Sequence, residues 1–161
     1  MRFVNFYPPY LGAGIRVMFI APDWSTIKVR LALNWLNRNL FGTQFGGSLY
    51  AMCDPFFVII LMRQLGADYT VWDRAACIQF LRPGRGPVTT TFHIPTERVE
   101  EIRALADRGE KVEPVFQAEV VDETGQVVRG PVSKARAQQL LAILRPAFPT
   151  YRLVREAEAP R

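Results

Sequence analysis

The chain has 161 residues, a mass of 18.3 kDa and a formal net charge of +5, with a pI of about 9.6. Hydrophobic residues make up 49% and charged residues 22%, proportions that are typical of a globular domain and exclude a disordered chain. The positive charge favours an anionic partner. Because the arginines are scattered, we expect a small anionic molecule and no nucleic acid. One domain over residues 1–161 is the expected organisation.

The two cysteines, Cys53 and Cys77, have neither the spacing of metal ligands nor that of a disulfide framework. The first ten residues lack a continuous apolar core and a small-residue cleavage site, so we predict no signal peptide. Together these features favour a cytoplasmic protein with no metal and no cofactor.

In the first part of the chain, a segment with alternating apolar and charged residues is followed by a long, continuous apolar run. Ile27, Val29 and Leu31 alternate with charged residues, which is typical of a half-buried strand. We predict a short helix or irregular lead-in at 3–13, strands at 15–21 and 26–33, a loop at 34–44 and a helix at 45–65 that ends near Gly66.

The second part alternates in the same way but is divided by turns and by one surface helix. Thr96 is a candidate cap for that helix, and Gly109 a candidate end. We predict strands at 69–81, 88–94, 112–121 and 126–137, a Pro- and Gly-rich joint at 82–87, a turn at 122–125 and a tail after 144.

This order of elements predicts an α+β fold. A long helix that is apolar on all sides needs a sheet wrapped around it, and about six antiparallel strands could do this. The core of the domain is expected over residues 14–138, with the long central helix at about 45–65 and a frayed tail at 145–161.

Asp54 is the single charged residue in the apolar stretch 45–62. The stretch is near the lower length limit for a membrane span, but Asp54 and Pro55 at its centre argue against one. A mid-membrane Asp costs roughly 2.5–3.5 kcal/mol. We therefore expect a fully buried helix in a soluble protein, where a lone carboxylate is costly unless it has a pairing or a chemical role.

Gly46 and Gly47 precede Asp54 at the start of the same predicted helix. Free backbone N–H groups at a helix start suit a developing oxyanion, and glycine allows a ligand close to the backbone. Asp54 could then act as nucleophile or general base. The alternative is that the glycines only allow tight packing and that Asp54 only accepts local hydrogen bonds.

The segment from Asn39 to Gly47, followed after six residues by Asp54, resembles the Asn…His-Gly-Gly…Asp motif of hotdog-fold acyl-CoA thioesterases of the phenylacetate-pathway type. The segments 80–83 and 122–125 look like the strand-end and turn signatures of that family. The pattern covers most of residues 14–138. It is most similar to the branch of tetrameric acyl-CoA thioesterases.

The resemblance implies a hotdog fold, hydrolysis of acyl-CoA thioesters and a homodimer or dimer of dimers. In the motif, Asp54 matches the catalytic carboxylate, Gly46 the amide that polarises the thioester carbonyl, and Asn39 the residue that orients the carboxylate or water. Thr43, Phe45 and Gly47 are then expected at the substrate. Phe45 departs from the motif, because many members have His there, and this puts catalytic efficiency in doubt.

Arg82 and Arg85 lie in the joint between two predicted strands. Guanidinium groups suit the phosphates of coenzyme A. We expect these arginines to bind coenzyme A, with a solvated turn as the alternative.

Two further hypotheses compete with thioester hydrolysis. The same fold could bind an acyl chain without turnover because Phe45 replaces His, or the chain could be a structural domain in which Asp54 is only a hydrogen-bonding centre. A Cys53–His93 nucleophile is a weaker alternative.

For the hydrolase, the spacing of the two motif residues predicts a site shared between two subunits. Gly46 and Asp54 would be roughly 12 Å apart along one straight helix. This distance is too long for both to act on one thioester.

Overall fold

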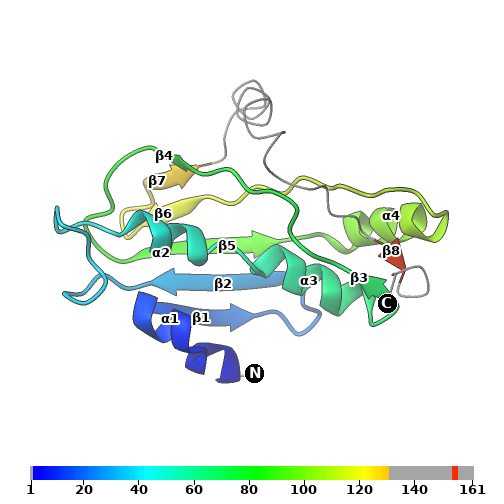
Figure 1. The fold of residues 1–161 in the computed structure, drawn as a ribbon, viewed down its shortest axis with the longest axis horizontal. Coiled ribbons are helices and arrows are strands. Elements are labelled where there is room, and N and C mark those ends of the chain that lie inside the picture. The colour runs from blue at the N-terminus through cyan, green and yellow to red at the C-terminus, as the bar shows by residue number, and fades with distance from the viewer. Residues whose placement is uncertain (1, 131–153, 156–161) are drawn as a thin grey trace.

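The computed structural model describes residues 2–130 and 154–155 (Figure 1). Most of the strand predicted at 126–137 and of the tail after 144 therefore lies outside the described residues. The chain begins with a 3-10 helix, η1 (Arg2–Phe6), and a short helix, α1 (Pro8–Ala13). Two prolines start α1, where a missing backbone N–H costs nothing because the first turn has no intrahelical acceptor for it.

A single antiparallel sheet of six strands forms the body of the molecule (Figure 1). Its order is β1-β2-β5-β6-β7-β4, and each neighbouring pair is antiparallel. The predicted α+β fold with about six strands is thus confirmed. The strands are β1 (Ile15–Ile20), β2 (Thr26–Leu31), β4 (Gln79–Phe80), β5 (Val88–His93), β6 (Val120–Asp122) and β7 (Val127–Gly130).

The alternation in β2 determines which face of the sheet is buried. Ile27, Val29 and Leu31 are at most 1% exposed, whereas Lys28 between them is exposed. In register, Ile27 lies opposite Phe92 of β5, and Phe92 is also fully buried. The apolar face of the sheet therefore lies against the central helical segment, as a period of two predicts.

The central helix runs over 46–65 in two pieces, α2 (Gly46–Ala51) and α3 (Phe56–Leu65). Proline explains the interruption. Pro55 has no N–H to donate, and it disfavours a helical conformation of the residue before it. Figure 1 shows that α2 and α3 follow one another along the sheet and do not fold back on each other. The stacked rings of Phe56 and Phe92, 5.0 Å apart, join α3 to the sheet.

The central segment is only partly buried, which corrects the expectation of a fully buried helix. By length and composition alone, Gly46–Leu65 could cross a membrane, as can the core helix of many water-soluble proteins. Only 39% of its most apolar window is buried, and the side chains of Tyr50 and Met62 are 37% and 50% exposed. One side of the segment packs on the sheet, and the other remains open in the single chain.

Two predicted strands are much shorter than the alternation suggested. Within 69–81, only β3 (Tyr69–Thr70) and β4 are strands, and within 112–121 only the start of β6 is one. β3 pairs instead with β8 (Val154–Arg155). An alternating sequence predicts a chain with two faces, but a strand also needs a hydrogen-bonding neighbour, and residues 71–78 and 110–119 form no ladder in this chain.

The surface helix α4 (Thr96–Asp107) is present with Val99 and Ile102 buried. Thr96 is its first residue and does not cap it, because the N-cap position is Pro95 and no side chain there accepts a hydrogen bond. Gly109, with a φ of 74°, ends the helix as expected.

Candidate functional site

Asp54 lies at the corner between α2 and α3, and its side chain is exposed. This corrects the prediction of a carboxylate buried within a continuous helix. The proline that follows Asp54 breaks the helix and leaves the carboxylate at an open bend. Within residues 2–130 and 154–155, no cation forms an ion pair with Asp54. The carboxylate is therefore open to solvent or to a ligand.

The charge of Asp54 acts on two residues that are distant in sequence. Burial, followed by the charges of Asp54, Tyr7 and Cys53, raises the pKa of the Tyr10 hydroxyl far above its usual value. Desolvation, followed by the charge of Asp54, raises the pKa of Asp73. The fold thus gathers an acidic pair and a buried phenol around the corner between α2 and α3. No pattern in the sequence identifies Tyr10 or Asp73 as neighbours of Asp54, because both are distant from it along the chain.

Gly46 is the first residue of α2, and two aromatic rings surround the start of this helix. A Cβ placed on Gly46 would lie 3.2 Å from the tip of the Phe80 ring. A Cβ on Gly47 would come too close to the Phe45 ring. Both rings are more than half exposed. Glycine at these positions therefore keeps the backbone accessible between two apolar walls, which a larger side chain would fill.

Asn39 shapes the loop before Gly46 and does not contact Asp54. Its Oδ1 accepts hydrogen bonds from the backbone N–H groups of Phe41 and Thr43, at 2.9 and 3.0 Å. Its Nδ2 donates to Thr43 Oγ1 at 2.8 Å and to the Gln44 carbonyl at 3.2 Å. Thr43 is likewise used within the loop. In the single chain, these two predicted site residues position the backbone that enters α2.

Gln44 is a structural residue that the sequence analysis missed. It is buried, and its Nε2 donates to the carbonyls of Gly86 at 3.0 Å and Ala32 at 3.3 Å. Its backbone N–H donates to the Gly84 carbonyl at 2.9 Å. These bonds hold the 82–87 joint against the loop that enters α2. The position of Gln44 next to Phe45 was the only available signal.

Arg82 and Arg85 have different environments, although they lie three residues apart. Arg82 donates from Nε to the Val127 carbonyl at 2.9 Å and from Nη2 to Asp122 Oδ2 at 2.7 Å, and it also contacts Gln126. Arg85 is exposed and forms no ion pair with any described residue. Of the two predicted phosphate ligands, Arg82 is committed to the turn after β6, and Arg85 is open.

The contacts of His93 do not support the alternative of a Cys53–His93 nucleophile. The ring Nδ1 of His93 lies 2.9 Å from Thr26 Oγ1 across the paired strands β2 and β5. His93 is thus an exposed strand residue whose ring contacts the neighbouring strand. Over the described ranges, no group of three or more His, Cys, Asp or Glu residues could hold a metal ion.

A family model described as a domain of unknown function, DUF4442, matches residues 1–134. Nothing among curated proteins matches the sequence.

Several solved structures are similar to this chain at low sequence identity. A Pseudomonas aeruginosa protein of unknown function, described as a probable thioesterase, has a TM-score of 0.66 and 20% identity, covering 81% of this chain and 82% of its own. A thioesterase from Haemophilus influenzae has a TM-score of 0.58 and 14% identity, covering 80% and 81%. The PaaI protein of the E. coli phenylacetic acid degradation operon has a TM-score of 0.52 and 19% identity, covering 80% and 84%. These similarities confirm the predicted hotdog fold.

Proposed function

We propose that this chain, which belongs to the DUF4442 family and has a hotdog fold, hydrolyses acyl-CoA thioesters. The proposal rests on the residues of this chain, since the family model describes a domain of unknown function. The observation that carries this proposal is the position of Asp54, an exposed carboxylate without an ion pair among the described residues, at the break in the central helix. Structures with the same fold include proteins described as thioesterases. The partial match to the Asn…His-Gly-Gly…Asp motif, from which Phe45 departs, supports the same reaction.

Asp54 acts either as nucleophile or as general base. As a general base it accepts a proton from water while the water oxygen attacks the thioester carbon, and the coenzyme A thiolate leaves. As a nucleophile it forms a mixed anhydride, which water then hydrolyses. An open corner suits both routes because substrate and water can reach the carboxylate. The raised pKa of Asp73, to which the charge of Asp54 contributes after desolvation, also supports a functional role, since groups with perturbed pKa values gather at active sites.

The backbone N–H of Gly46 is the proposed donor to the thioester carbonyl oxygen. At the first position of a helix this N–H has no intrahelical acceptor. The neighbouring Phe45 and Phe80 rings supply an apolar surface on which such a hydrogen bond is stronger than in open water. Thr43 and Asn39 contribute by fixing the loop that presents this N–H.

The proposed site requires two copies of the chain. The helix rise from Gly46 to Ala51 alone is about 7.5 Å, and Asp54 lies beyond the end of α2. A carbonyl about 3 Å from the Gly46 nitrogen and a nucleophile about 3–3.5 Å from its carbon span only about 6 Å. Gly46 of one copy and Asp54 of another can meet across a twofold axis. The open side of α2 and α3 supports such pairing.

Arg85 is the proposed cation for the phosphates of coenzyme A. It lies in the joint that Gln44 holds beside the loop entering α2, and it has no ion pair with a described residue. Arg82 contributes indirectly by holding the joint to the turn between β6 and β7.

Thiol release from a panel of acyl-CoA thioesters tests the proposed reaction. The wild-type chain should release coenzyme A from at least one of them, and Asp54→Asn should reduce kcat by at least about 10²-fold, the lower end of general-base contributions. Asp68→Asn is a matched control, because Asp68 is also exposed and follows the same helical segment. Equal activity in wild type and Asp54→Asn would refute the proposed role of Asp54.

A binding protein without turnover is the second candidate, and Phe45 is the observation that favours it. Its ring, 55% exposed, stands where the motif has a polar histidine. Binding of an acyl-CoA by a wild-type chain that releases no thiol would select this function over hydrolysis.

A further inference from the structure

A cavity of about 760 Å³ opens between α3 and the first two strands of the sheet. Its volume is within the range of small-molecule sites in proteins. The lining is predominantly apolar and includes Val17 of β1, Ile27 of β2, and Phe56 and Ile59 of α3. Phe56 and Ile27 are at most 1% exposed, so the cavity reaches the core of the domain. None of the proposed site residues lines it.

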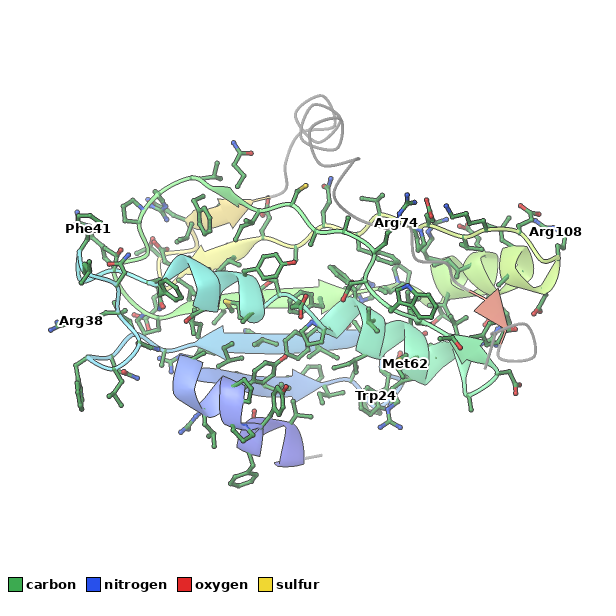
Figure 2. All side chains as sticks on the ribbon, viewed as in Figure 1. Trp24, Arg38, Phe41, Met62, Arg74 and Arg108 are labelled. Carbon is green, nitrogen blue, oxygen red and sulfur yellow. The ribbon has the colours of Figure 1, made fainter. Side chains whose placement is uncertain are left out.

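The edge of this cavity carries one cation held against an aromatic ring. The guanidinium carbon of Arg63 lies 4.8 Å from the centre of the Trp24 ring, a cation–π distance. Both residues line the cavity, and Figure 2 shows Trp24 close to Met62, another lining residue, beside α3. Arg63 forms no ion pair with a described residue. Its charge therefore has no carboxylate partner within the described part of the chain.

Trp24 has an unusual backbone conformation. With a φ of 62°, it is the one non-glycine residue with positive φ over the described ranges. A bulky side chain in this region is costly, and such outliers gather at functional sites. The turn around it is closed by a hydrogen bond from the Trp24 N–H to the Ala21 carbonyl, at 2.9 Å. The strained backbone at Trp24 therefore coincides with the position of its indole ring at the edge of the cavity, against the Arg63 guanidinium.

We propose that this cavity binds a long-chain carboxylate, such as a fatty acid. The apolar interior takes the alkyl chain, and the Arg63 guanidinium at the edge pairs with the carboxylate. A guanidinium suits the two oxygens of a carboxylate, and one cation without an ion pair among the described residues suits a single negative charge. A thioester has no charge at the corresponding carbon, so Arg63 selects the free acid over an acyl-CoA. The site is separate from the one proposed around Asp54 and does not depend on it.

Isothermal calorimetry with dodecanoate, below its critical micelle concentration, tests the site on the full chain. We expect the wild type to bind and Arg63→Gln to raise Kd about five- to tenfold, since charge-assisted hydrogen bonds are lost. Arg38→Gln is the matched control, because Arg38 is also exposed and unpaired among the described residues but lies at the far end of the molecule (Figure 2). This control should leave Kd unchanged.

A second pair of variants tests the cavity itself. Ala67 lines the opening and is exposed, so Ala67→Trp should fold normally and weaken dodecanoate binding at least about tenfold by filling the entry. Ala104→Trp, on the exposed side of α4, should not change Kd. Dodecanol separates the two parts of the site: it should bind wild type and Arg63→Gln equally.

The fatty-acid site can be overturned without any bearing on the proposed thioester hydrolysis, because the two sites share no residue. Absence of dodecanoate binding to the wild type, or binding that neither Arg63→Gln nor Ala67→Trp weakens, would overturn the fatty-acid site. Asp54→Asn should bind dodecanoate as the wild type does, whether or not the chain hydrolyses thioesters.

Discussion

Arg82 Nη2 lies 2.7 Å from Asp122 Oδ2, and this ion pair joins the end of β4 to the turn between β6 and β7. A neighbouring hydrogen bond from Arg82 Nε to the Val127 carbonyl strengthens the connection. Arg85, three residues on, has no such contact within the described part of the chain. Two arginines that look equivalent in the sequence thus have different roles in the fold.

The first prediction separates these roles. Arg82→Ala should lower the free energy of unfolding by about 1–2 kcal/mol, because it removes a charge-assisted hydrogen bond and leaves the Val127 carbonyl without its donor. Arg85→Ala should leave stability unchanged and raise KM for an acyl-CoA more than it lowers kcat. Urea unfolding and steady-state kinetics on both variants measure this. An unchanged KM in Arg85→Ala would place the coenzyme A phosphates elsewhere.

The second prediction concerns the pH dependence of stability that follows from the effect of the Asp54 charge on Asp73. The folded chain raises the pKa of Asp73 through desolvation and then through Asp54. At pH 7 an ionised Asp73 therefore costs stability, and this cost fades as pH falls through the raised pKa toward the ordinary value of 3.8. Asp73→Asn should stabilise the chain at pH 7 but not at pH 3.5.

Asp54→Asn removes one of the two causes, so it should also stabilise the chain at pH 7, by a smaller amount. Urea unfolding at the two pH values measures both variants. A less stable Asp73→Asn at pH 7 would show that Asp73 has a favourable partner in the folded chain.

The third prediction isolates the Gly46 N–H. Gly46→Pro deletes this N–H at the first helical position, where proline is favoured, and Phe45 before it already has an extended backbone, with a ψ of 128°. Gly46→Ala adds the same Cβ near Phe80 but keeps the N–H. We expect kcat to fall about 10²-fold or more in the proline variant, as for loss of an oxyanion donor.

The alanine variant should retain most of the wild-type kcat. Circular dichroism establishes that both variants are folded. Equal losses in the two would mean that space beside Phe80, and not the N–H, is what Gly46 provides.

Local patterns in the sequence predicted the parts of the fold that depend on hydrophobic alternation or on a single helix-ending residue. The alternation at Ile27, Val29 and Leu31 identified β2 and its buried face. Gly109 marked the end of α4. These features depend on neighbouring residues only, and so a single sequence contains them.

The sequence-based predictions were wrong or incomplete where contacts between distant residues, or a single proline, determine the structure. The apolar run at 45–62 suggested a buried carboxylate, but Pro55 divides the helix and exposes Asp54. The Arg82–Asp122 pair and the approach of Asp73 to Asp54 depend on how the fold brings separate segments together. Spacing along the chain cannot reveal such contacts, because each depends on the completed fold.

Mixing two inactive variants tests most directly the central claim that Gly46 of one copy and Asp54 of another act on the same thioester. Asp54→Asn and Gly46→Pro, carrying different affinity tags, are unfolded together, refolded and assayed for thiol release. Random pairing makes about half of the dimers mixed, each with one intact site, so we expect about a quarter of the wild-type activity. Recovery of the doubly tagged dimer without any return of activity would contradict a site shared between two copies.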